Sequence, residues 1–333
     1  MSEEDLEVSI WPHIKDDVTV EKIMYSVVIA LIPPTALGIY TFGWYVLALM
    51  IASVASALAT EYVALRLMDK KFEMDGSAIV TGMLLSLIIP PASPIWVPIV
   101  GSAIGIAIGK VAFGGLGHNV FNPAIVGRLF LTGSWPKLMT TWKSPVSSLF
   151  VWKASETTGA TPLASGFSRA AEPIFDITQN LAIDQIHLDL FLGKVSGCVG
   201  ETSALAILIG GIFLIAVKYI DWTVPVTYIG TVGILMAILG KDPLFQILAG
   251  GLFFGAFYMA TDYSTSPMTR KGRILFAAGA GVLVVVIRTI GGYPEGVAFS
   301  IMIMNGFAPL IDRVTRPRTY GTTRSWFSWG DEE

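Results

Sequence analysis

The feature that most limits how this chain can fold is its succession of apolar segments. A helix needs about 20 mostly apolar residues to cross the hydrocarbon core of a bilayer. Ten segments approach that length: 23–41, 43–65, 76–91, 95–113, 121–133, 202–220, 222–240, 243–261, 272–290 and 294–312. Only 14% of the residues are charged, against about 25% in soluble domains. The sequence therefore predicts an all-α integral membrane protein with about ten transmembrane helices.

Basic residues near the ends of these segments indicate the orientation of the chain. An even number of crossings puts both termini on one side, together with these basic residues: Lys15, Lys22, Arg66, Lys70, Lys71, Lys218, Arg270, Lys271, Arg273, Arg313, Arg316, Arg318 and Arg324. The short connections on the other side carry only Lys241. Basic residues in short loops stay in the cytoplasm, whereas long loops cross largely regardless of charge. We expect a multi-pass protein of the inner cell membrane with cytoplasmic termini.

The chain divides into two halves of five predicted spans each. A cytoplasmic segment (1–22) precedes the first half (23–133), an external loop (134–201) separates it from the second half (202–312), and a cytoplasmic tail (313–333) follows. The stretch DGSAIVTGMLLSLIIPPASP in the first half resembles LAGGLFFGAFYMATDYSTSP in the second. Because five is odd, two such halves would be inverted repeats, which usually build a central site. The alternative is that glycine-rich membrane helices simply look alike.

Several polar residues lie at membrane depth, where charged groups are usually paired or functional. Arg128 and Arg288 are expected to pair with Glu201 or Glu295, although a phosphate is an alternative partner. Glu61 lies about one turn from the end of its span and is expected to reach the interface. The spacing of Gly101, Gly105 and Gly109, and that of Gly251 and Gly255, favours close helix packing.

Two asparagines stand at the start of a short predicted helix, in GGLGHNVFNPAIVG. Asn119 and Asn122 would present carboxamides and backbone N–H groups to whatever occupies the cytoplasmic mouth of that helix. Each asparagine by itself is also consistent with a plain turn and a helix cap. Asp262 ends the eighth predicted span on the same side.

Catalytic groups are otherwise scarce. The single cysteine, Cys198, excludes an internal disulfide and an iron–sulfur cluster held by this chain alone. No glycine-rich dinucleotide fingerprint opens a βαβ unit. We expect no catalytic residue, no metal site and no nucleic-acid partner, with the lipid bilayer as the main surroundings.

One polar stretch of the external loop stands out, TTGATPLASGF at 157–167. Gly159 and Ala160 leave Thr161 sterically open, and Pro162 prevents a regular helix there. Such a hydroxyl suits enzymatic modification.

The segment SETTGATPLA resembles the flavin-attachment motif of the D subunit of Rnf complexes, which the B subunit of Na⁺-translocating NADH:quinone reductases shares. Further resemblances follow in order along the chain: DGSAIVTGMLLSLIIPP, GGLGHNVFNPAIVGR, GKVSGCVGETSALAILIGG, ATDYSTSPMTRKG and YPEGVAFSIMIMNGFAPLID. The resemblance implies that Thr161 carries FMN through a phosphoester bond installed by an external flavin transferase. The family often has Asp six residues earlier, where this chain has Ser155, followed by Glu156.

The resemblance also implies a function. The chain would be the membrane electron-transfer subunit of an ion-translocating ferredoxin:NAD⁺ oxidoreductase, inactive alone and coupled to Na⁺ or H⁺ movement. Its partners would be other membrane and peripheral subunits, including a second flavin-carrying subunit. A non-covalent riboflavin would lie near the cytoplasmic face, and Asn119, Asn122 and Asp262 are the expected contacts, because carboxamides satisfy the imide edge of a flavin without adding charge.

Two alternatives stay open. One is the B-type subunit of a quinone-reducing relative, which the short tails of this chain disfavour by resemblance. The other is a solute channel, because five-plus-five inverted halves resemble the architecture of urea transporters. A channel needs neither the Thr161 segment nor redox partners.

The predicted orientation has a direct test. A cysteine introduced at Ser147 in the external loop should react with a membrane-impermeant thiol reagent in right-side-out vesicles, because short-loop basic residues place the termini in the cytoplasm. The unmodified chain, which carries only Cys198, is the control. Labelling confined to inverted vesicles would contradict the topology.

Overall fold

The computed structural model describes residues 18–70, 72, 74–143, 158–159, 163, 180–291 and 295–316 of the chain. Several sequence predictions therefore fall outside the described residues, notably Thr161 with Ser155 and Glu156, and the outer parts of the two tails.

The first half of the chain forms a sequence of helices that follows the predicted spans. They are α1 (Val20–Ala30), α2 (Ile32–Phe42), α3 (Tyr45–Leu67), α4 (Ser77–Leu87), α5 (Trp96–Gly109) with the short 3₁₀ turn η1 (Val111–Phe113), and α6 (Pro123–Ser134). The first predicted span contains two helices, α1 and α2, separated only by Leu31. Pro33 and Pro34 begin α2, and proline is well tolerated in the first turn of a helix because the N–H that it lacks has no intrahelical partner there.

The second half also follows the predicted order, with one interrupted segment. Its helices are α10 (Ala204–Ala216), α11 (Thr223–Ile238), α12 (Pro243–Leu248), α13 (Leu252–Phe254), the π-helix η3 (Gly255–Met259), α14 (Arg270–Ile290) and α15 (Val297–Thr315). The prediction of one continuous span at 243–261 is wrong, because the chain breaks between α12 and α13. Gly250 and Gly251 have φ values of 70° and 67°, a left-handed conformation that glycine adopts without steric cost.

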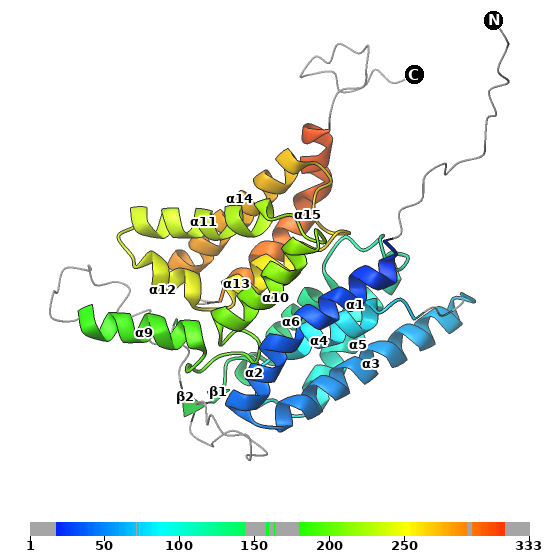
Figure 1. The fold of residues 1–333 in the computed structure, drawn as a ribbon. Coiled ribbons are helices and arrows are strands. Elements are labelled where there is room, and N and C mark those ends of the chain that lie inside the picture. Colours follow the sequence, from blue (N-terminus) through cyan, green and yellow to red (C-terminus); the bar gives the residue numbers. More distant parts are fainter. Residues whose placement is uncertain are drawn as a thin grey trace, which may run out of the picture.

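The long loop 134–201 is less irregular than the sequence indicated. It contains α7 (Pro136–Met139), the antiparallel pair of two-residue strands β1 (Trp142–Lys143) and β2 (Thr158–Gly159), and α9 (Asn180–Leu192). In Figure 1, α9 extends along one side of the second half, beside α12. These elements were not expected, because a long polar loop carries no apolar periodicity to predict them.

Five of the described helices are long and apolar enough to cross a membrane: Val20–Phe42 taken as one, Tyr45–Leu67, Trp96–Phe113, Arg270–Ile290 and Val297–Thr315. Ser77–Leu87, Ala204–Ala216 and Thr223–Ile238 are apolar but shorter. The chain is therefore a multi-pass membrane protein, and the number of crossings stays a prediction.

The same packing pattern occurs in both halves (Figure 1). α3 packs against α4 and α5, and α5 against α6; likewise α11 packs against α12 and α14, and α14 against α15. The halves meet where α10 contacts α1 and α2, and where α15 contacts α6. The third helical segment is the short helix α4 in the first half and the broken α12–α13 segment in the second.

Glycines allow the closest of these contacts, as the sequence spacing predicted. A Cβ on Gly105 of α5 would lie 2.5 Å from the carbonyl oxygen of Pro123, and one on Gly109 would lie 2.9 Å from its Cα. A Cβ on Gly127 of α6 would overlap the carbonyl oxygen of Gly101. α5 and α6 therefore touch backbone to backbone.

This contact predicts opposite effects for two substitutions in the same helix. Gly127→Ala should destabilise the protein by about 1–3 kcal/mol, the usual cost of overpacking. Gly133→Ala should be neutral or stabilising by up to about 1 kcal/mol, because nothing lies within 4 Å of its Cβ position. Thermal denaturation of the detergent-solubilised chain measures both. Equal midpoints for the two variants would contradict the close approach of α5 and α6.

Candidate functional site

The larger of the two main pockets lies between the two halves. It is lined by α1, the first turns of α4, the connection from α5 to α6, the end of α10 and the segment from η3 to Ser264. The pocket encloses about 750 Å³ of space, part of which is open to solvent. Because it lies at the starts of α1, α4 and α6, the pocket is on the side that the sequence assigns to the cytoplasm.

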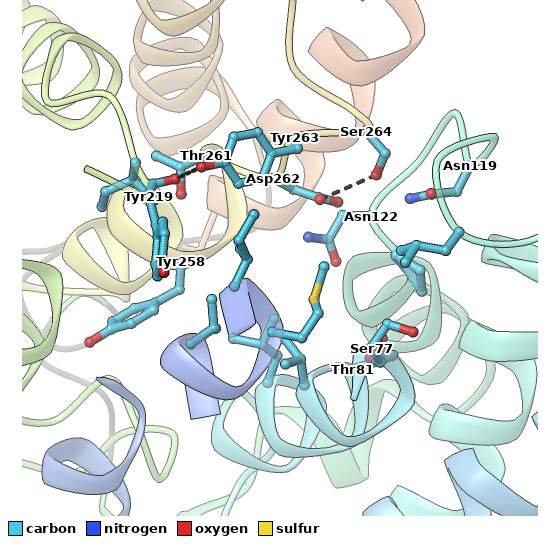
Figure 2. Close-up of a pocket in the computed structure, with 18 of the residues that line it drawn as sticks. Ser77, Thr81, Asn119, Asn122, Tyr219, Tyr258, Thr261, Asp262, Tyr263 and Ser264 are labelled. Carbon is cyan, nitrogen blue, oxygen red and sulfur yellow. Dashed lines mark hydrogen bonds between the residues drawn. The ribbon is translucent and has the colours of Figure 1, made fainter. Parts of the chain in front are cut away.

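The three residues expected to bind a flavin all line this pocket: Asn119, Asn122 and Asp262. They come from segments more than a hundred residues apart in the chain. In Figure 2, Asn119 and Tyr258 lie on opposite sides of the pocket, with Asn122 and Asp262 between them. The structure therefore places the three expected residues around one pocket.

Asn119 has a polar atom without a partner. Its side chain is buried, with 4% of the residue exposed. The amide nitrogen reaches the carbonyl oxygen of Phe121 at 3.4 Å, but the amide oxygen Oδ1 has no hydrogen-bond partner among the described residues. Buried polar atoms are nearly always satisfied by protein, water or ligand. The Oδ1 of Asn119 is thus an acceptor available to a bound molecule.

Asn122 has a structural task as well as a place in the pocket wall. Its Oδ1 accepts hydrogen bonds from the backbone N–H groups of Ala124 at 3.0 Å and Ile125 at 3.4 Å, which caps the N-terminus of α6. The plain helix cap that the sequence left open is therefore present. The capping bonds occupy only the amide oxygen of Asn122.

Asp262 follows η3 and lies half-buried in the pocket wall. The hydroxyls of Ser264 and Thr265 donate to its two carboxylate oxygens at 3.2 and 3.4 Å. Burial raises the pKa of Asp262, and the two hydroxyl hydrogen bonds act in the opposite direction because they favour the ionised form.

The inner end of the pocket is apolar and braced across the two halves. Val80 and Leu84 of α4 and Phe257 of η3 contribute apolar surface. The hydroxyl of Tyr258 donates to the carbonyl oxygens of Ala30 at 2.9 Å and Ile207 at 3.2 Å, which ties η3 to α1 and α10. A flat apolar ring with a polar edge would match this combination of surfaces.

A buried lysine, which the sequence reading overlooked, also lines the pocket. Lys110 is 2% exposed and contacts Glu61 and the hydroxyl of Ser77, with Asp75 at 3.9 Å. The expectation that Glu61 reaches the interface is wrong, because Glu61 is only 5% exposed and pairs with Lys110. The available signal was the position of Lys110 inside the predicted span 95–113, where an unpaired ammonium group is costly.

A second, smaller pocket lies between the halves, around Arg128. Arg128 donates to Glu201 at 2.9 Å and to Glu295 at 2.5 Å, so the expected pairing is confirmed. Arg288 does not pair in this way. It donates instead to the backbone carbonyls of Gln246 at 2.5 Å and Ala249 at 3.0 Å.

Three potential metal ligands meet beside Arg128. The ligand atoms of Cys198, Glu201 and Glu295 lie within 4.8 Å of one another. Arg128 already holds both carboxylates, and its positive charge opposes a cation there. In this structure the two carboxylates of the group belong to an ion-pair network with Arg128.

Thr161 lies outside the described residues, but positions on either side of it are described. Gly159 of β2 pairs with Trp142 of β1. Leu163 is buried with Leu190 of α9 and Ala249, which follows α12. None of these described residues lines the large pocket.

Comparisons with known proteins agree on one family. A sequence model described as the NQR2, RnfD, RnfE family matches residues 7–321. The chain is 44% identical over 329 residues to the D subunit of the proton-translocating ferredoxin:NAD(+) oxidoreductase complex of Clostridium ljungdahlii, covering 95% of this chain and 96% of that protein. It is also 44% identical over 327 residues to the D subunit of the Na(+)-translocating ferredoxin:NAD(+) oxidoreductase complex of Acetobacterium woodii, covering 97% and 98%.

A third relative is slightly less similar in sequence. The D subunit of the ion-translocating oxidoreductase complex of Stutzerimonas stutzeri is 42% identical over 327 residues, covering 91% of this chain and 92% of that protein. The two more similar relatives differ in the ion that their names give, although both are 44% identical to this chain. Sequence identity therefore does not separate Na⁺ from H⁺ here.

Proposed function

The chain belongs to the NQR2, RnfD, RnfE family, and we propose that it is the membrane electron-transfer subunit of an Rnf-type ferredoxin:NAD⁺ oxidoreductase. The names of its relatives and their near-complete coverage of the chain support this assignment over a quinone-reducing enzyme. Electron transfer in the complex would be coupled to movement of Na⁺ or H⁺. The subunit would work only with the other membrane and peripheral subunits, one of which carries a second flavin.

The observation that carries the proposal is the pocket with its unpartnered Asn119 oxygen. A buried acceptor without a partner, next to apolar surface and a second carboxamide, fits the donor and acceptor edge of a non-covalent riboflavin. When bound, the flavin would supply one- and two-electron redox chemistry.

The residues of the chain have distinct tasks in this proposal. Asn119 would accept a hydrogen bond from the flavin edge, and the free amide nitrogen of Asn122 would donate one. Val80, Leu84 and Phe257 would cover the apolar ring and exclude water from it. Tyr258 would keep the wall rigid through its bonds to Ala30 and Ile207.

The covalent FMN is a separate proposal, supported by the resemblance around SETTGATPLA and by family membership. Thr161 would carry FMN through a phosphoester bond on the external side, after modification by a flavin transferase. An external flavin and a cytoplasmic one would place redox groups at both faces of the membrane.

We also propose that the two halves are inverted five-helix repeats that cross an inner cell membrane ten times, with both termini cytoplasmic. The matching packing of α3, α4 and α5 with α11, α12 and α14 supports this arrangement. The third segment is a short helix in the first half and an interrupted one in the second, which supports it further, since short or broken helices at corresponding positions are typical of inverted repeats. The same architecture would suit a urea-transporter-like channel, which is the competing function.

The covalent flavin separates these alternatives. The purified chain, produced together with its flavin transferase, should show flavin fluorescence that survives SDS denaturation, and Thr161→Ala should abolish it. Thr157→Ala is the matched control and should keep it, because the modified hydroxyl is that of Thr161. Mass spectrometry of the tryptic peptide identifies the modified residue. Fluorescence that persists in Thr161→Ala, or is absent from the wild type, would favour the channel.

The riboflavin site has its own test. Replacing Asn119 and Asn122 by Leu should lower the riboflavin content of the purified chain while the covalent FMN is retained. Each replacement removes a hydrogen bond worth on the order of 1 kcal/mol net. Because Asn122 also caps α6, Asn119→Leu alone is the cleaner variant. Unchanged riboflavin stoichiometry in Asn119→Leu would mean that the site lies elsewhere.

A further inference from the structure

We propose that Arg288 is the counter-ion of the phosphodiester that joins FMN to Thr161, and that Leu163 holds the flavin-bearing segment beside it. The proposal rests on the covalent flavin proposed above and goes beyond it, because it names the residues that bind the phosphate. Three observations carry it: the buried charge of Arg288, a donor of its guanidinium without a partner, and the place of Leu163.

Arg288 lies near the end of α14 and carries a buried positive charge. Only 3% of the residue is exposed. None of the ion pairs between described residues includes Arg288, and the buried carboxylates of Glu201 and Glu295 are both held by Arg128. A buried charge is costly unless an opposite charge accompanies it. An anion that reached Arg288 would therefore be bound strongly.

The guanidinium of Arg288 also keeps a donor free. Nη1 donates to the backbone and side-chain oxygens of Gln246 at 2.5 and 3.3 Å, and Nη2 donates to the carbonyl oxygens of Ala249 at 3.0 Å and Gly250 at 3.4 Å. Nε has no hydrogen-bond partner among the described residues. All of these acceptors are neutral. They satisfy four N–H groups of the guanidinium but do not supply a negative charge.

Leu163 lies next to this guanidinium. A Cβ on Gly250 would lie 2.1 Å from Cδ1 of Leu163 and 3.0 Å from Nη2 of Arg288, so both side chains approach the same point of the backbone. Leu163 is 5% exposed and packs with Leu190 of α9 and with Ala249. Burial of this leucine fixes one position of the loop beside the end of α12.

Chain connectivity ties the proposed attachment residue to the same place. Thr161 lies outside the described residues, two positions before Leu163. Two residues span at most about 7 Å. A phosphodiester on Thr161 is therefore tethered within reach of the Arg288 guanidinium. Its single negative charge balances that of Arg288, and its oxygens accept the N–H groups of arginine in a geometry that a planar guanidinium matches well.

The test compares each chain with and without its covalent flavin. Wild type and variants are produced with and without the flavin transferase, solubilised in the same detergent, and heated while the helical circular dichroism is recorded. Flavinylation should raise the apparent melting temperature of the wild type by at least about 2 °C, the shift that a charge-assisted hydrogen bond produces in a large chain. Comparison within one variant cancels the effect of the substitution itself.

Two variants should lose most of this flavin-dependent shift. Arg288→Lys keeps the charge, but its single nitrogen cannot hold the carbonyls of α12 and a phosphate together. Leu163→Ala leaves Arg288 in place and releases the segment. Arg273→Lys and Leu188→Ala are the matched controls and should keep the wild-type shift, because Arg273 pairs with Asp221 and Leu188 is 58% exposed.

The mobility of the flavin gives a second readout that a purely structural role of Arg288 at the end of α12 would not change. The fluorescence anisotropy of the covalent flavin in the folded chain should fall in Arg288→Lys and in Leu163→Ala, since the phosphodiester is no longer held. Both control variants should keep the anisotropy of the wild type.

The outcomes separate the inference from the covalent flavin itself. A wild type that carries the flavin without any melting shift, or a shift and anisotropy unchanged in Arg288→Lys, would overturn the inference and leave the flavin on Thr161 standing. If one of the two variants does not fold or is not flavinylated, the other decides in the same way. A wild type without SDS-stable fluorescence would overturn both proposals.

Discussion

The rest of the structure depends on how the ends of two short helices, α4 and α12, are satisfied inside the protein. The hydrocarbon core offers no water to a free carbonyl group, so a broken helix is tolerated only where protein supplies its partners. Arg128 donates to the carbonyl oxygen of Ile88, just after α4, at 2.7 Å, and Arg288 donates to the carbonyls of Gln246 and Ala249 at the end of α12. Each half thus uses one buried arginine for the helix end of its third segment.

These arginines also connect distant parts of the chain. Arg128 binds Glu201 just before α10 and Glu295 just before α15, so a single guanidinium joins the first half to two connections of the second. Gly200 adds a backbone bond of 2.7 Å to the carbonyl of Leu87. Because removing one partner would leave buried charges uncompensated, the network holds the two halves in one relative arrangement and so maintains the pocket between them.

The pocket and the ion-pair network around Arg128 both lie between the two halves, but they differ in their polar groups. The network is dominated by charges that satisfy one another, whereas the pocket keeps one acceptor, the Oδ1 of Asn119, without a partner among the described residues. Lys110 in its wall is already held by Glu61 and lies 3.9 Å from Asp75, and Asp262 adds a carboxyl group to the wall. A neutral, ring-shaped ligand with donor groups at its edge matches these surfaces.

The sequence by itself determined the class of the protein, the order of its apolar segments, the glycine contacts and the residues worth testing. Hydrophobicity, glycine spacing and sequence motifs are local properties, so each can be recognised without knowing which residues pack against the segment.

The interruption of the 243–261 segment was missed, because an apolar window does not reveal two glycines with positive φ. The role of Glu61 was also misjudged, since its partner Lys110 is 49 residues away. Only the tertiary structure decided that Asn119, Asn122 and Asp262 face one pocket. It also decided that Arg128 pairs with both Glu201 and Glu295, whereas Arg288 binds backbone carbonyl oxygens. These contacts join distant segments, so they depend on how the helices pack.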